Sequence, residues 1–187
     1  MLFRKTGRLI SLSEQQILDC TENARYGQQG CGGGTASVAL TYIRDQGGID
    51  SNASYPYIAF TGGDCFYQPD KAVGEDKGYV ALPAGDEHAM KAAVATVGPL
   101  SVALNSDCFA FQIYDRGVID TTAEECSPEN LDHAVLVVGY GSDGATGLDY
   151  WIVKNSWGTD WGEAGYARIA RGSNVLGIAN LVVYPLV

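Results

Sequence analysis

Hydrophobic residues recur at two different spacings along this chain, and the spacing changes near residue 100. Before that point, apolar residues recur every three or four positions in 35–46 and 86–97, which predicts amphipathic helices. After it, short β-branched and aromatic runs separated by Gly, Asp and Ser predict strands. These runs are 100–104, 111–119, 131–140, 149–153, 166–169 and 178–184. Helices followed by antiparallel strands indicate an α+β fold.

Turn and capping residues place the ends of the first two helices. In Ser13-Glu14-Gln15-Gln16, the Ser13 hydroxyl is expected to accept the Gln16 amide while the Gln16 side chain reaches back. This capping box predicts a helix that runs to Asp19. The second helix begins at Thr35 and ends where Gly47-Gly48 provides a left-handed stop.

A third helix and a boundary between two lobes follow. Asp86 is expected to cap the third helix, and Gly98-Pro99 ends it. The boundary is expected between Tyr67 and Lys77 or just beyond. We therefore predict a mainly helical lobe over 1–76 and a mainly β lobe over 77–187.

Composition excludes several classes of protein. The chain has 187 residues, with 12 Lys and Arg against 22 Asp and Glu, and its net charge of −10 is the wrong sign for binding nucleic acid. An apolar fraction of 46% with 18% charged residues excludes a disordered chain. The longest apolar run, Ala134–Val138, is far shorter than the roughly 20 residues of a membrane-spanning helix. The first residues contain no apolar signal-peptide core.

The cysteines favour disulfides over a metal site. None of them forms a CxxC pair, so a structural zinc site or a thioredoxin-type motif is not expected, and no cofactor or metal is implied. Disulfides indicate an oxidising compartment, which conflicts with the missing signal segment and suggests that something is absent from the N-terminus. The odd count leaves one thiol unpaired. The five are Cys20, Cys31, Cys65, Cys108 and Cys126.

Only two histidines are available for catalysis. His88 lies beside Asp86 and Glu87 in the first turn of a helix, and we interpret it as a solvated surface residue. His133 opens the apolar run 134–138, where a hydrogen-bonded structural histidine and a catalytic one are equally good interpretations. The segment 154–162 favours catalysis, because Asn155 is followed by two tryptophans that are costly to leave exposed. A neutral Asn that fixes the tautomer of a His, shielded by indoles, suits a Cys-His mechanism.

These motifs resemble those of the papain-like cysteine proteases of the cathepsin L type, in family order along the whole chain. The match that carries most weight is Leu131-Asp132-His133-Ala134 followed by Asn155-Ser156-Trp157-Gly158. The resemblance implies a two-lobed papain-like fold with an incomplete helical N-terminal lobe and an antiparallel, β-barrel-like C-terminal lobe. It also implies that His133 is the general base, Asn155 orients it and Trp157 shields the pair. Other matching stretches are 12–15, 19–20, 30–34, 55–57, 97–99, 138–141, 161–162 and 165–166.

The nucleophile of the resembling family is not found in the chain. In the family signature the nucleophile lies about 130 to 150 residues before the histidine. Counted back from His133, this range begins at about residue 3 and extends to about 17 positions before Met1. No cysteine precedes Cys20. The segment Met1–Leu9 resembles the last turns of the helix that carries the nucleophile, so neither that cysteine nor the oxyanion-hole glutamine is present. We therefore expect the chain as given to be inactive.

The resemblance also assigns the cysteines. It implies a bridge between Cys20 and Cys65, and an upstream partner for Cys31, which should then be the free thiol. The position of the family partner of Cys126 is occupied by Leu176. For Cys126, a bridge to the additional Cys108 and no bridge are therefore equally expected.

Substrate-binding positions follow from the same resemblance. Glycines 32–34 are expected to pair with an extended substrate, and the pocket for the second residue upstream of the cut has uncharged walls that favour an aliphatic or aromatic side chain. An acid at the Leu181 position would have admitted Arg; the alternative is that Leu181 and Ala103 are simply core. The pocket walls are Thr35, Ala36, Ala103, Leu131, Ala134 and Leu181. Together with Gly32, Gly33, Gly34 and Asp132 they make up the expected substrate-binding set.

The leading hypothesis is a Cys-His-Asn endopeptidase domain represented by an incomplete chain. The alternatives are a non-catalytic homologue that binds peptides or acts as a scaffold, and a gene-model product that never folds. The expected partners are polypeptide substrates or protein inhibitors, with self-association through an exposed truncated face. The resemblance implies a lysosomal or extracellular location, with which the glycosylation sequon Asn52-Ala53-Ser54 is compatible.

Overall fold

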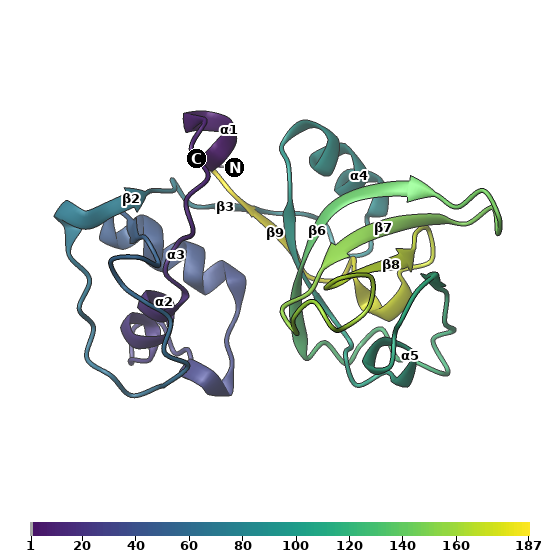
Figure 1. The fold of residues 1–187 in the computed structure, drawn as a ribbon, viewed down its shortest axis with the longest axis horizontal. Helices are drawn as coiled ribbons and strands as arrows, with labels where there is room; N and C mark the ends of the chain where they lie inside the picture. Colours follow the sequence, from purple (N-terminus) through teal and green to yellow (C-terminus); the bar gives the residue numbers. More distant parts are fainter. Residues whose placement is uncertain (1) are drawn as a thin grey trace. The chain divides into compact units, whose positions relative to one another are not determined.

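The computed structural model describes residues 2–187, which divide into two compact units (Figure 1). The first unit contains the chain up to Val80 together with Pro185–Val187, and the second contains Ala81–Tyr184. The change from the first unit to the second falls four residues after the end of the predicted helical lobe, 1–76. The last three residues return to the first unit, which the sequence does not indicate.

The first unit is mainly helical, with one small sheet in which β1 and β2 pair in antiparallel fashion. Its elements are α1 (Leu2–Thr6), α2 (Glu14–Thr21), η1 (Gly30–Gly32), α3 (Ala36–Gln46), β1 (Ile49–Asp50), η2 (Pro69–Lys71), β2 (Ala72–Gly74) and the start of β3 (Tyr79–Ala81).

The N-terminus of α2 forms half of the predicted capping box. The Ser13 hydroxyl accepts the backbone N–H of Gln16 at 3.0 Å, as predicted. The reciprocal contact was wrongly predicted, because the Gln16 side chain turns into the unit. There its Nε2 donates to the Tyr42 hydroxyl at 3.0 Å and its Oε1 accepts the Asp50 N–H at 2.7 Å. Gln16 is fully buried, so its amide satisfies buried polar groups instead of a helix end.

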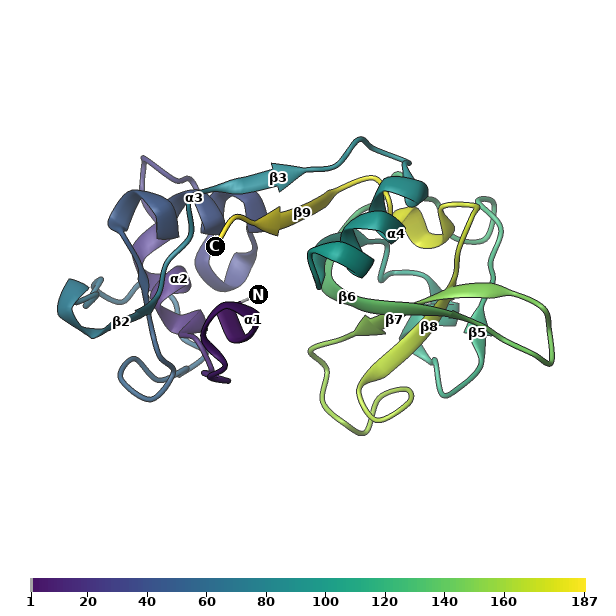
Figure 2. The same ribbon diagram turned by 90° about the horizontal axis from the view of Figure 1, so that it is seen from above.

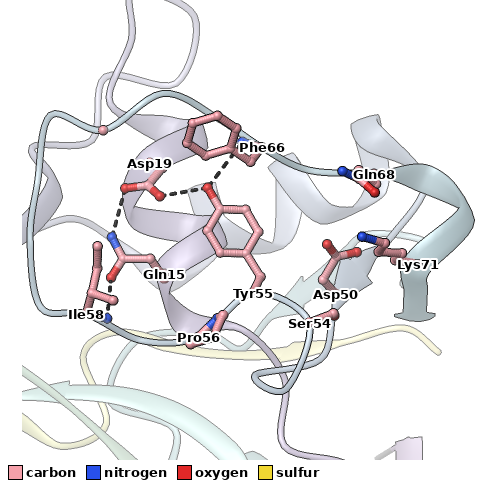
Figure 3. Close-up of a pocket in the computed structure, with 11 residues that line it drawn as sticks. Gln15, Asp19, Asp50, Ser54, Tyr55, Pro56, Ile58, Phe66, Gln68 and Lys71 are labelled. Atoms are coloured by element: carbon pink, nitrogen blue, oxygen red, sulfur yellow. Dashed lines mark hydrogen bonds between the residues drawn. The ribbon is translucent and has the colours of Figure 1, made fainter.

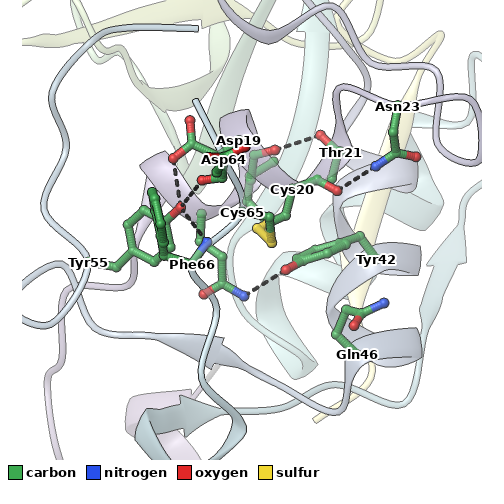
Figure 4. Close-up of a disulfide and its surroundings, with 12 residues drawn as sticks. Asp19, Cys20, Thr21, Asn23, Tyr42, Gln46, Tyr55, Asp64, Cys65 and Phe66 are labelled. Atoms are coloured by element: carbon green, nitrogen blue, oxygen red, sulfur yellow. Dashed lines mark hydrogen bonds between the residues drawn. A yellow bond between two sulfur atoms is a disulfide. The ribbon is translucent and has the colours of Figure 1, made fainter. Parts of the chain in front are cut away.

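Helix α3 follows the prediction at both ends. Thr35 occupies the N-cap position, and Gly47 ends the helix at φ 79°, a left-handed conformation that glycine adopts without steric cost. Tyr42 and Ile43 on its inner face pack with Cys20 and Ile49 in a small core. The Cys20–Cys65 disulfide lies beside this core (Figure 4).

The second unit is built on strands. A seven-stranded sheet has the order β3-β9-β4-β6-β7-β8-β5, in which β9, β4, β6, β7 and β8 pair antiparallel in turn and β5 pairs parallel with β8. Helix α4 is capped by the Asp86 side chain, as predicted, and packs against β4 and β6. Figure 2 shows α4 beside β6. The elements are α4 (Glu87–Thr96), β4 (Leu100–Leu104), α5 (Phe109–Gln112), β5 (Val118–Ile119), β6 (His133–Ser142), β7 (Asp149–Lys154), β8 (Tyr166–Ala170), η3 (Val175–Gly177) and β9 (Val182–Pro185).

Two of the predicted strands are largely wrong. The run 111–119 contains the end of α5 and only the two-residue β5, and the run 178–184 forms β9 only from Val182 onward. In both places the buried apolar residues, such as Phe111 and Ile178, enter the core from a short helix or a turn. Burial accounts for their hydrophobicity, which therefore does not require a strand.

The sheet is not a closed barrel: in the described residues, β3 and β5 are its two end strands. The predicted barrel-like lobe is thus an open sheet, covered by an apolar core that includes Trp151, Val137 and Ile169. Over residues 2–187, no helix has the length and apolar character needed to cross a bilayer.

Candidate active site

His133 and Asn155 come from neighbouring strands of the second unit. His133 is the first residue of β6, and Asn155 directly follows β7. The two strands pair antiparallel, with Leu136 opposite Lys154, so the start of β6 lies beside the residues that follow β7. The sheet register therefore brings together two residues that are 22 positions apart in sequence.

The predicted contact between the two side chains is confirmed. His133 Nε2 lies 2.8 Å from Asn155 Oδ1, and the same oxygen accepts the backbone N–H of Ser156 at 2.7 Å. An amide oxygen only accepts hydrogen bonds, so Nε2 must carry the proton that it shares with Asn155. In the neutral ring, Nδ1 is then the unprotonated nitrogen, able to accept a proton from another group. Asn155 is 8% exposed, which protects this hydrogen bond from water.

Aromatic rings surround the histidine. The Trp157 indole lies at a centroid distance of 5.0 Å from the His133 ring with an interplanar angle of 31°, so it covers the imidazole as predicted. Trp161 lies 5.5 Å from Trp157. The expectation that the tryptophans avoid exposure holds only in part, because Trp157 remains 42% exposed.

Phe111 belongs to the same cluster, although the sequence did not point to it. Its ring centroid lies 6.2 Å from His133, 5.3 Å from Trp157 and 4.9 Å from Trp161. Its carbonyl oxygen also accepts the Trp161 indole N–H at 3.2 Å. The residue sits on the four-residue α5 inside a segment predicted as strand, so no sequence periodicity identified its direction.

The loop after Asn155 is fixed to the sheet at its far end. The Asn155 N–H donates to the Gly165 carbonyl at 3.0 Å, and the Gly165 N–H donates to the Trp161 carbonyl at 2.8 Å. Next to them, Glu163 forms an ion pair with Arg168 of β8 at 2.6 Å, and this hydrogen bond holds the pKa of Glu163 below its usual value. These contacts fix the positions of the asparagine and both tryptophans.

The predicted substrate-binding residues divide between the two units. In the second, Ala103 of β4 is opposite Ala134 of β6, and the Ala103 N–H donates to the Leu181 carbonyl at 3.1 Å. Leu181 is 45% exposed, which disfavours the alternative that it is simply core. Leu131 is half-buried, and the Asp132 carboxylate accepts the Ser106 N–H at 2.7 Å.

In the first unit, the other predicted binding residues form one exposed segment. Glycines 32–34 and Thr35 are exposed, and Ala36 is the first residue of α3. The Gln28 side-chain amide bonds both the Thr35 N–H, at 2.7 Å, and the Thr35 carbonyl, at 3.2 Å. Thr35 is therefore held in an extended conformation, whereas Gly32 ends η1 and Gly33 has a φ of 122°; the backbone of all three glycines is accessible.

Two cysteine predictions are confirmed: Cys20 pairs with Cys65, and Cys31 is free and exposed. Cys126, for which pairing and no pairing were equally expected, forms a bridge with Cys108. Cys31 lies in η1 of the first unit, while His133 and Asn155 lie in the second. His88 is exposed, as predicted for a surface residue.

A pocket of about 340 Å³ lies in the first unit (Figure 3). Asp19 on its wall accepts the Gln15 amide and the Tyr55 hydroxyl, at 2.8 and 2.7 Å. Burial, with a smaller contribution from this contact, raises the pKa of Tyr55 to about 12. None of the predicted catalytic or substrate-binding residues lines this pocket.

Comparison with known proteins matches both the sequence and the fold. The model of the family described as "Papain family cysteine protease" matches residues 1–186. A "Cathepsin L-like peptidase" of Aedes aegypti is 52% identical over 99% of this chain and 53% of its own length, and "Cathepsin L2" of Homo sapiens is 47% identical over 98% and 54%. The chain thus spans about half the length of the curated relatives it matches.

A solved structure shows the same fold. The digestive procathepsin L 3 of Tenebrio molitor larval midgut superimposes with a TM-score of 0.89 at 42% identity, covering 100% of this chain and 59% of the other. The mixed α and β architecture seen here is therefore the architecture of procathepsin L structures.

Proposed function

Because the chain belongs to the papain family of cysteine proteases, we propose that His133 is the general base of a cysteine endopeptidase and that Asn155 orients it. The observation that carries the proposal is the hydrogen bond from His133 Nε2 to Asn155 Oδ1. It leaves Nδ1 as the basic nitrogen and fixes the plane of the ring. A catalytic base oriented by a third group in this way is the arrangement that nucleophilic catalysis requires.

The proposed reaction uses these atoms in order. Nδ1 of His133 takes the proton of a cysteine thiol, and the resulting thiolate attacks the carbonyl carbon of a peptide bond. When the C–N bond breaks, the imidazolium returns the proton to the departing amine, and water then hydrolyses the acyl-enzyme. Asn155 Oδ1 accepts the hydrogen bond from Nε2–H in both charge states of the ring, and the neutral amide adds no negative charge. Trp157 covers the pair and limits the access of water.

We propose that the cysteine nucleophile lies outside these 187 residues. Four of the five cysteines are in disulfides, and the fifth, Cys31, lies in a Gly-Cys-Gly segment that lacks the family's nucleophile pattern. A base without a nucleophile cannot form the acyl-enzyme, so the 187-residue chain by itself should not cleave peptides. The coverage of about half of each relative is consistent with this proposal.

The proposed substrate preference rests on the uncharged residues Ala103, Ala134 and Leu181. They form a partly exposed apolar group in the second unit, which suits an aliphatic or aromatic side chain two positions upstream of the cut bond. In the first unit, the accessible backbone of glycines 32–34 would pair with an extended peptide.

The test compares this chain with a chimera in which the preceding catalytic-domain segment of the Aedes aegypti relative is joined before Met1. The chain alone should not cleave peptide substrates, and the chimera should cleave them. His133→Ala should reduce the activity of the chimera by about 10³-fold or more, and Asn155→Ala should reduce it by less. His88→Ala, at an exposed histidine, is the matched control and should leave activity unchanged.

Two results would contradict the proposal. One is robust cleavage by the 187-residue chain alone. The other is a folded chimera that binds a peptide with an apolar side chain but does not cleave it, which would favour the non-catalytic, peptide-binding alternative. Leu181→Glu in the chimera tests specificity separately, because an acid there should shift the preference toward Arg.

The remaining proposals concern partners and location. Polypeptide substrates and protein inhibitors are the proposed partners, and the two disulfides support an oxidising compartment, lysosomal or extracellular.

Self-association is proposed through the segment that contains α1, where Phe3 is 53% and Leu9 is 88% exposed. Sedimentation of the wild type and of Phe3→Ser/Leu9→Ser tests this, since the double variant should remain monomeric at concentrations where the wild type associates.

A further inference from the structure

The turn that follows β1 presents an asparagine with the sequence requirement for a glycan. Asn52-Ala53-Ser54 is the only Asn-X-Ser/Thr triplet in the chain. It lies in the turn that begins at Ser51, where the N–H groups of Ser54 and Tyr55 both donate to the Ser51 carbonyl, at 3.1 and 2.9 Å. Ala53 and Ser54 are exposed, and Asn52 is partly exposed.

The folded chain also fixes the direction of the Asn52 carboxamide. The Asn52 backbone N–H donates to the Ser11 carbonyl at 2.8 Å, which holds the residue against the segment before α2. Its side-chain Oδ1 accepts the Tyr57 N–H at 3.0 Å. The carboxamide oxygen is therefore hydrogen-bonded within the loop, and Nδ2 lies on the opposite side of the carboxamide from that hydrogen bond. A glycan attached to Nδ2 leaves the oxygen and its hydrogen bond intact.

We propose that Asn52 is an N-glycosylation site of the folded protein. In the transfer, Nδ2 displaces a lipid diphosphate from the anomeric carbon of a lipid-linked oligosaccharide. The C–O bond to the diphosphate breaks, a C–N bond forms, and Nδ2 loses one of its two protons. The site is independent of the proposed peptidase activity, because no residue of the triplet belongs to the catalytic or substrate-binding set.

The neighbouring surface gives the glycan a physical role. Tyr57, whose N–H holds the Asn52 side chain, is 54% exposed, and Ile58 and Phe60 on the same segment are 65% and 59% exposed. A bulky hydrophilic glycan beside this apolar segment reduces its access to other chains. Loss of the glycan should therefore increase association without moving the His133–Asn155 hydrogen bond, which lies in the other unit.

The test is expression of the full chain behind a cleavable secretion leader in insect cells, with peptide mass mapping of every translocated chain, secreted or retained. The proposal predicts a glycan on Asn52, removed by a peptide N-glycosidase. Ser54→Ala should abolish it and Ser54→Thr should preserve it. Ser51→Ala, in the same turn but outside the triplet, is the matched control and should keep the glycan.

Two outcomes would overturn the proposal. The first is a translocated chain with an unmodified Asn52. The second is a glycan found only on chains in which the Cys20–Cys65 bridge has not formed, because modification would then be confined to misfolded protein. A glycan on chains that contain the native bridge and a free Cys31 supports it.

Discussion

The two units of this chain are stabilised by different kinds of contact. Within residues 2–187, the second has a large apolar core between its sheet and the flanking helices, whereas the buried members of the apolar cluster in the first are Cys20, Tyr42, Ile43 and Ile49. The first unit instead buries polar side chains, including Gln15 and Gln16, which are 1% and 0% exposed. Each unit contains one disulfide, so the difference is that the first depends more on specific hydrogen bonds and the second more on buried apolar area.

The pKa values of the carboxyl groups also differ between the two units. Burial raises the pKa values of Asp50 and Asp76 in the first unit, and one carboxylate oxygen of each is buried without a hydrogen-bond partner. In the second unit, hydrogen bonds hold the pKa values of Asp143, Asp149 and Glu163 below their usual range. Exposed Asp45, whose pKa Arg44 lowers, is the exception in the first unit. Lowering the pH should therefore stabilise the first unit through its raised carboxyl pKa values and destabilise the second through its lowered ones.

The largest effect is expected from removing core volume in the second unit. Trp151 is fully buried, and its indole N–H donates to the Glu87 carboxylate at 2.8 Å. Trp151→Ala should lower the free energy of unfolding of this unit by about 3–5 kcal/mol, because it leaves a cavity and removes one hydrogen bond of a buried carboxylate. Urea unfolding measures the loss. Trp157→Ala, at a 42% exposed indole, is the control and should cost clearly less.

Opening the disulfide of the first unit should have the next largest effect. Cys20 and Cys65 are 45 residues apart, so their bridge contributes about 4 kcal/mol on the loop-entropy model. In Cys20→Ala/Cys65→Ala, amide hydrogen exchange should accelerate in α2 and α3 while β6 and β7 remain protected. Cys31→Ala should change neither region. Equal acceleration in both units would contradict the distinction between them.

Removing the buried side-chain amide of Gln16 should lower the stability of the first unit even when the side-chain volume is kept. Gln16→Leu preserves the approximate volume but leaves the Tyr42 hydroxyl and the Asp50 N–H without their partner. We expect a loss of about 1–3 kcal/mol in the free energy of unfolding. Gln29→Leu, at an exposed glutamine, should change it little. Similar losses in the two variants would show that the buried network contributes nothing specific.

The smallest expected effect is on pH dependence. The folded-state pKa of Asp50 is raised above its ordinary value of 3.8, so the folded state binds the proton more tightly than the unfolded state. Stability from this group is present at low pH and decreases as pH rises through the raised folded pKa. Asp50→Asn should flatten the pH dependence of hydrogen exchange in the first unit above about pH 4, and an unchanged slope would contradict this. The second unit should not respond.

The sequence predicted most of the parts that regular periodicity determines. Helices α2 and α4 begin at the predicted N-caps, Ser13 and Asp86, and α3 ends at the predicted Gly47. Strands β4, β6, β7 and β8 lie where the apolar runs placed them. It failed at 111–117 and 178–181, where buried side chains such as Phe111 reach the core from a short helix or a turn. A hydrophobicity pattern records that a residue is buried, and not the backbone conformation from which it is buried.

The candidate active site was also predicted only in part. The motifs around His133 and Asn155 identified the pair, and the register of β6 with β7 explains why they meet. The contribution of Phe111 was not predictable, because it depends on the direction of α5. The polar interior of the first unit was also missed: Gln16 was interpreted as part of a helix cap, since sequence alone does not show which polar side chains are buried.

The tautomer of His133, measured by ¹⁵N NMR at a pH where the ring is neutral, shows whether Asn155 orients this histidine as a base. The hydrogen bond to Asn155 Oδ1 predicts a protonated Nε2 and an unprotonated Nδ1 in the wild-type chain, and a mixture of tautomers in Asn155→Ala. A neutral His133 with the proton on Nδ1, or a tautomer ratio that Asn155→Ala leaves unchanged, would contradict the claim that Asn155 prepares this histidine to accept a proton.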